Sequence, residues 1–144
     1  MKKSVLAITL VSVVAFIITA CSSKTTSDVA VPSGKTIKSV AVGNLTASLS
    51  NSTGQLKSGT REVVLAFTDS SGKPVDVGAV SLNFHMAQMG AMAAMNDQAS
   101  FTTTATPGVF QGKVHIEMAG EWQGQLAYEG PAGTGKTTFT VTAQ

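Results

Sequence analysis

The sequence predicts an all-β domain, an immunoglobulin-like β-sandwich of about seven short strands. Three observations support this prediction. Apolar and polar residues alternate in several runs, most clearly at 80–86 and 110–118, as in strands that bury one face. Turn-forming clusters such as 50–54 and 69–74 separate the runs. No long helical period follows the N-terminal segment, so the pattern favours a sandwich.

The strands are expected in a simple order along the chain. They are predicted at 40–49, 61–68, 80–86, 100–106, 110–118, 121–128 and 137–142. In the run at 80–86, Leu82, Phe84 and Met86 share one parity, and Asn83 and His85 share the other. This strand should therefore bury its apolar residues and expose its polar ones. A loop with one helical turn at 91–95 is expected to follow.

The first 20 residues have the features of a secretory signal peptide. Lys2 and Lys3 precede an apolar run at 5–18, which is short for a membrane span. Ile18-Thr19-Ala20-Cys21 resembles the bacterial lipobox, which implies cleavage before Cys21 and attachment of lipid to its sulfur. An ordinary secreted protein and a retained N-terminal anchor are the alternatives.

This resemblance predicts three segments and a location. The signal peptide would occupy 1–20, a flexible tether rich in Ser, Thr, Lys, Gly and Pro would occupy 21–38, and the domain would occupy 39–144. The protein would be extracytoplasmic and anchored to the bacterial cell membrane through lipid on Cys21.

Charge and cysteine content exclude several classes of protein. The formal net charge is +2, and Lys2 and Lys3 supply both charges, so the mature chain is neutral. No basic stripe remains to bind nucleic acid, and nucleic-acid motifs are absent. Cys21 is the only cysteine, so its lipidation would leave no thiol for disulfides, zinc–thiolate sites or catalysis. No catalytic constellation is visible, and we expect no enzyme.

A methionine-rich run follows the strand at 80–86. Four methionines lie at intervals of three between Met86 and Met95, beside His85, and the only other histidine, His115, lies three residues before Met118. Thioethers and imidazoles are ligands for soft metals and select Cu(I). Methionine also fills apolar cores, so packing is the alternative.

The predicted site joins the ends of two strands. If these ends are neighbours in the sandwich, the soft ligands meet at one rim. The favoured ligands are Met86, Met89, Met92, His115 and Met118, with His85 as a further candidate and Met95 as a bystander. The predicted cofactor is copper, with Cu(I) favoured.

Several motifs together resemble the YtkA-like domain, which is related to the FixH family. They are Gly72-Lys73-Pro74-Val75 before a strand, the segment 108–114, Met118-Ala119-Gly120-Glu121-Trp122, and the terminal strand at 137–141. The resemblance covers roughly residues 38–144. It implies a β-sandwich linked to copper handling, with a copper-receiving partner such as an oxidase assembly factor or an efflux system. Family members often carry proline in the methionine-rich loop, where this chain has alanines.

Two other features have alternative interpretations. The segment 130–137 has the spacing of a Walker A loop, but a strand rather than a helix follows it, so a hairpin loop is expected. Trp122 is expected to anchor the core, and the alternative places its ring over the copper site.

The alternative function is a non-catalytic interaction module that uses the methionine-rich loop as a protein-binding patch.

Overall fold

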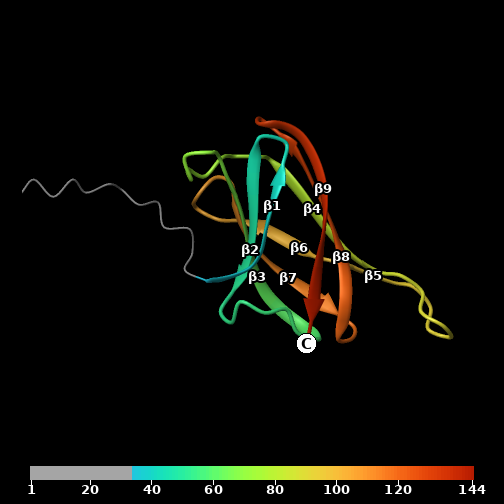
Figure 1. Cartoon of the computed structure of the whole chain (residues 1–144). Helices are drawn as coiled ribbons and strands as arrows, with labels where there is room; N and C mark the ends of the chain where they lie inside the picture. The colour runs from blue at the N-terminus through green and yellow to red at the C-terminus, as the bar shows by residue number, and fades with distance from the viewer. Residues whose placement is uncertain (1–33) are drawn as a thin grey trace, which may run out of the picture.

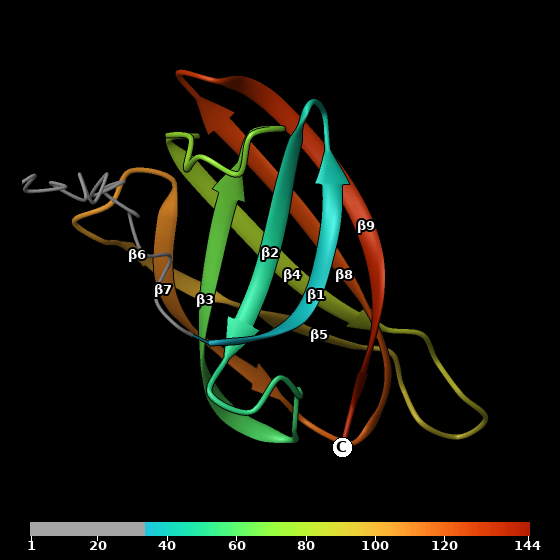
Figure 2. The ribbon, with the colours of Figure 1, turned by 60° about the vertical axis from the view of Figure 1, so that its left-hand side comes forward.

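A computed structural model describes residues 34–144, and these form nine strands in two antiparallel sheets (Figures 1 and 2). The strands are β1 Lys35–Val42, β2 Leu45–Asn51, β3 Gly59–Thr68, β4 Ala79–Met86, β5 Met95–Gln98, β6 Ser100–Thr103, β7 Val109–Ile116, β8 Gly120–Gly130 and β9 Gly133–Ala143. One sheet has the order β1-β2-β3-β7-β6, and the other has the order β5-β4-β8-β9. The predicted all-β sandwich is confirmed, whereas the predicted signal peptide, Cys21 and most of the tether lie outside the described residues.

The count of nine exceeds the expected seven for two local reasons. A turn at Gly43, which adopts a φ of 62°, divides the run predicted at 40–49 into β1 and β2. Strand β5 lies in the segment for which a loop and a helical turn were expected. Strand β1 also begins at Lys35, inside the segment predicted as tether.

The core lies between the sheets and contains the side chains that the alternation predicted to be buried. Phe67, Phe84 and Trp122 are fully buried, and Phe84 packs edge-to-face against Phe139 with 6.3 Å between ring centroids. Trp122 is thus a core residue, as predicted. Its indole Nε1 donates a hydrogen bond to the carbonyl oxygen of Met118 at 3.1 Å, so the buried polar atom is satisfied.

The hairpin that joins β4 to β5 projects from the sandwich (Figures 1 and 2, yellow). Met86 pairs with Met95, and an isolated bridge pairs Met89 with Met92. A two-residue turn of Gly90 and Ala91 closes the hairpin, and Gly90 adopts a φ of 56° that suits such turns. The helical turn expected at 91–95 was therefore wrong, because the chain reverses there.

Among residues 34–144, no helix is long and apolar enough to cross a membrane. The segment 130–137 forms the turn between β8 and β9, with Gly130 paired to Gly133. The prediction of a hairpin in place of a phosphate-binding loop is confirmed.

Candidate metal centre

The register of the β4–β5 hairpin explains the spacing of the methionines. The pairs Met86–Met95 and Met89–Met92 are three residues apart on both strands, so no bulge interrupts the register between them. Side chains of directly paired residues lie on the same face of a ribbon, and successive residues alternate between faces. Three steps along the strand reverse the face. The run therefore forms two methionine pairs that face in opposite directions.

The outer pair, Met89 and Met92, lies on the projecting part of the hairpin, beyond the end of β4. Met89 and Met92 exchange two backbone hydrogen bonds, of 3.2 and 2.9 Å, and their side chains are 53% and 40% exposed. His85 shares their parity and is half-buried. An open hollow of about 460 Å³ is bordered by His85 and Met89 together with Ala87 and Glu121. These three soft ligands therefore lie where an ion from solvent can reach them.

Asn96 positions the imidazole of His85 from the neighbouring strand. The two residues are directly paired, and Nδ1 of His85 lies 2.9 Å from Oδ1 of Asn96. In the tautomer with its proton on Nδ1, the imidazole donates a hydrogen bond to this amide oxygen. Nε2 of His85 is then unprotonated and is the nitrogen available to a metal ion.

The inner methionines face the core. Met86 is 3% exposed, and its partner Met95 is half-buried against the same core cluster, as is Met118. Gly120 has a φ of 147°, and a Cβ there would lie 2.9 Å from Cε of Met86, so the absence of a side chain leaves room for this methionine. Met86, Met95 and Met118 therefore pack in or against the core, and Met86 borders the same hollow as Trp122.

His115 does not join either set. It lies on β7, in the five-stranded sheet, and its neighbours Val114 and Ile116 point into the core. Its side chain is therefore on the outer face of the other sheet, where Nδ1 lies 3.2 Å from the hydroxyl of Thr60. The hypothesis that both histidines meet at one rim is not supported, because the core separates their faces.

The segment after β7 nevertheless approaches the β4–β5 hairpin through other residues. The backbone N–H of Glu117 donates to a carboxylate oxygen of Asp97 on β5 at 3.2 Å, and Met118 follows directly. Met118 packs against the same core cluster that contains Met86, as Met95 does, whereas His115 lies on the outer face of the five-stranded sheet. The sequence signal for Met95, its spacing from Met86, was noticed, but its role as the partner of Met86 was missed.

Hard ligands do not form an alternative centre in the described part of the chain. No group of three or more His, Cys, Asp or Glu side chains within residues 34–144 could hold a metal ion. Glu121 borders the hollow near His85, but it has no acidic partner there. Thioether sulfur is the other ligand type that the hairpin offers, and it favours soft ions.

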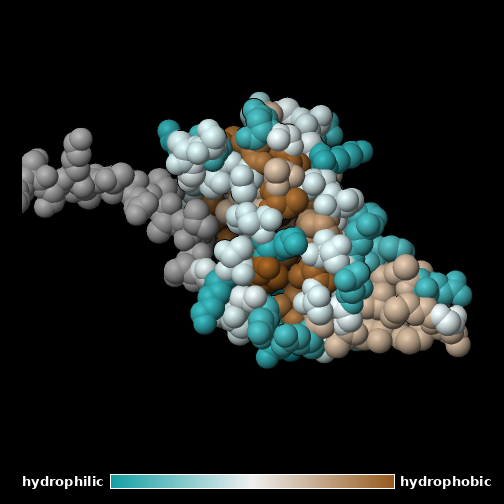
Figure 3. Space-filling view, viewed as in Figure 1, coloured by the Kyte–Doolittle hydropathy of each residue, from teal (hydrophilic) through white to brown (hydrophobic). Residues whose placement is uncertain are grey.

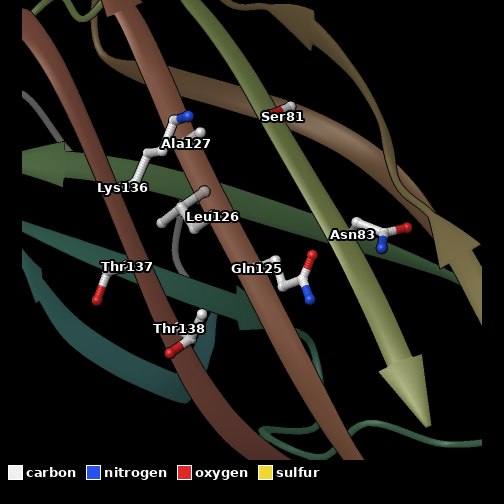
Figure 4. Close-up of a pocket in the computed structure, with 8 residues that line it drawn as sticks. All are labelled: Ser81, Asn83, Gln125, Leu126, Ala127, Lys136, Thr137 and Thr138. Atoms are coloured by element: carbon white, nitrogen blue, oxygen red, sulfur yellow. The ribbon is translucent and has the colours of Figure 1, made fainter. Parts of the chain in front are cut away.

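A larger hollow of about 550 Å³ lies on the same sheet face, farther along β4 (Figure 4). Asn83 and Gln125, a directly paired couple, carry its amide groups, and Ser81, Thr138 and Lys136 contribute the other polar atoms. It contains no sulfur and no imidazole. Its chemistry is that of a solvated polar sheet face, and we place the candidate centre at the hairpin.

Comparison with protein families identifies the family of the chain. A family model described as YtkA-like matches residues 39–127. No curated protein and no solved structure was found to match the chain. The relation to the FixH family stays a prediction.

Proposed function

The chain belongs to the YtkA-like family, and we propose that it is a copper-binding protein that holds or delivers Cu(I) without catalysing a reaction. The observation that carries this proposal is the common face of His85, Met89 and Met92 on an exposed hairpin. One imidazole and two thioethers form a ligand set that Cu(I) prefers over harder ions.

The geometry of the hairpin supports uptake from solvent. Met89 and Met92 are exposed, and an uncharged thioether needs no deprotonation to bind. Nδ1 of His85 lies 2.9 Å from Oδ1 of Asn96. With the proton on Nδ1, this contact fixes the orientation of the ring and leaves Nε2 for the metal ion. Met86, Met95 and Met118 lie in or against the core and are further thioethers of the same domain. We propose the outer set as the primary ligands.

The proposed location and partners follow from the N-terminal sequence and the family. We propose an extracytoplasmic lipoprotein, anchored to the bacterial membrane through Cys21, that passes copper to an oxidase assembly factor or an efflux system. The exposed tip is suited to such a transfer, because a receiving protein can approach the ligands from solvent.

An interaction module is the second candidate, and one observation favours it. The hairpin tip forms a projecting apolar lobe (Figure 3), in which Gln88 is the only polar side chain between Ala87 and Ala94, all of these residues being exposed. Exposed apolar patches of this kind mark interaction surfaces. Such a module would bind a protein partner through the tip in the absence of copper.

Competition with a chromogenic Cu(I) chelator under reducing conditions tests the copper proposal. The unmodified protein should withdraw one equivalent of Cu(I), and the double variant Met89→Leu/Met92→Leu should bind at least about tenfold more weakly. This expectation is conservative, because loss of a residue that only orients a ligand already costs about 10–100-fold in metal affinity. His85→Ala should show a similar loss.

His115→Ala is the matched control, since this histidine lies on the opposite face. It should leave the Cu(I) affinity unchanged. Equal losses in His115→Ala and His85→Ala would contradict the proposed ligand set. A protein that fails to compete for Cu(I) at all would favour the interaction module.

A further inference from the structure

The thioethers of the domain differ sharply in their access to solvent. Met89 and Met92 are the exposed large hydrophobic side chains of the described residues, at 53% and 40%, whereas Met86 is 3% exposed. Met95 and Met118 are half-buried against the core. We infer that Met89 and Met92 form a modification site, at which peroxide produces methionine sulfoxide before it reaches the other three residues.

The chemistry of this modification needs only contact between peroxide and a sulfur lone pair. Hydrogen peroxide transfers one oxygen atom to the thioether, so the sulfur is oxidised to a sulfoxide, the O–O bond breaks and water leaves. Susceptibility follows exposure, and the product is reversible by methionine sulfoxide reductases. The outer pair presents two such sulfurs on one face of a two-residue turn.

The fold tolerates oxygen at these two positions. Neither Met89 nor Met92 belongs to the core cluster, which contains Met86 and has Met95 and Met118 packed against it. A sulfoxide is polar and would lie in water at the tip, whereas the same group on Met86 would be buried without a partner. Oxidation of the outer pair therefore changes the chemistry of the tip without disrupting the sandwich.

The consequence for copper rests on the proposed function. Conversion to sulfoxide uses the sulfur lone pair and replaces a soft ligand with a hard oxygen, which Cu(I) disfavours. Oxidation of Met89 and Met92 should therefore abolish the outer site and leave a folded protein. Bound Cu(I) should in turn protect both residues, since the same lone pairs hold the ion.

Peptide mapping by mass spectrometry tests the modification in the metal-free protein. After treatment with limiting hydrogen peroxide, Met89 and Met92 should gain oxygen at least about fivefold faster than Met86, following their exposure. Circular dichroism and the fluorescence of Trp122 should remain those of the untreated protein. Oxidation of Met95 or Met118 at the rate of Met89 would overturn the assignment, as would loss of the fold.

A second measurement tests the link to copper. The oxidised protein should lose Cu(I) affinity to the extent seen in Met89→Leu/Met92→Leu, and treatment with methionine sulfoxide reductases should restore it. Undiminished Cu(I) affinity after oxidation of both residues would refute the proposed effect of oxidation on copper binding. If the untreated protein binds no Cu(I), the proposed function fails, and so does the proposed effect of oxidation on copper binding. The order in which the methionines are oxidised is then judged by the peptide map alone.

Discussion

At the scale of single residues, the candidate centre depends most on the contact between His85 and Asn96. It joins two directly paired residues of β4 and β5 at 2.9 Å. With the imidazole proton on Nδ1, this contact is a hydrogen bond to the amide oxygen, and Nε2 is the nitrogen available to a metal ion. Asn96 therefore acts as a positioning residue for the centre without being a ligand.

Replacement of Asn96 with leucine should release this constraint. In Asn96→Leu the fraction of His85 with its proton on Nδ1 should fall, and Cu(I) affinity should decrease by about 10–100-fold. The ¹⁵N chemical shifts of the imidazole measure the tautomer without metal, and chelator competition measures the affinity. Asn83→Leu, on the same face of β4 but without a hydrogen bond to His85, should change neither quantity. An unaltered tautomer population in Asn96→Leu would contradict the assigned role.

The β4–β5 hairpin is the element that sorts the methionines into two sets. Its two-residue turn sets a register in which Met89 pairs with Met92 and Met86 pairs with Met95. Gly90 makes this turn possible, since its φ of 56° is unfavourable for residues with a Cβ. The hairpin carries the outer ligands beyond the core, so its geometry affects the centre more than it affects global stability.

A β-branched residue at position 90 should therefore weaken copper binding selectively. Gly90→Val forces a left-handed conformation that costs about 1–2 kcal/mol, so the tip should rearrange and Cu(I) affinity should fall. The melting temperature should change little, because the tip is outside the core. Gly133→Val is the matched control, since Gly133 also has a positive φ and open space around it, but in the β8–β9 turn. Equal Cu(I) affinities of the two variants would argue against a role for the turn.

At the scale of the whole molecule, the sandwich core decides which residues can meet. His85 and His115 both have outward parity, but they belong to different sheets, and the core lies between their faces. Strand β4 is attached to this core through its own Phe84, and Trp122 of the neighbouring β8 is buried in the same core. The core thus holds the base of the hairpin in place while the tip stays free.

Truncation of a core aromatic side chain should destabilise the entire sandwich. Phe84→Ala removes a fully buried ring that packs against Phe139, and the free energy of unfolding should fall by about 3–5 kcal/mol. Urea denaturation followed by the fluorescence of Trp122 measures this change. Thr138 lies on the exposed face of β9, so the free energy of unfolding of Thr138→Ala should stay within about 0.5 kcal/mol of that of the original protein. A small effect of Phe84→Ala would mean that this core is less tightly packed than the structure shows.

Much of the fold could be predicted because alternation is a local property of the chain. The inward parity of Leu82, Phe84 and Met86 and the outward parity of His85 follow from the pleat of a strand, and the structure agrees. The family was also recognisable from sequence motifs, and its model matches residues 39–127. The strand β5 was missed because its Met-Asn-Asp-Gln sequence has no apolar alternation of its own and becomes a strand through pairing with β4.

The sequence by itself determined the sandwich, the family and the choice of methionine and histidine as candidate soft ligands. Only the tertiary structure decided which of them share a face. The spacing of three residues fits a helical turn as well as a ribbon, and the Gly90 turn makes it a ribbon with paired methionines. The separation of His115 from His85 depends on the assignment of β4 and β7 to different sheets. Sheet assignment is set by contacts distant in sequence, which local alternation does not encode.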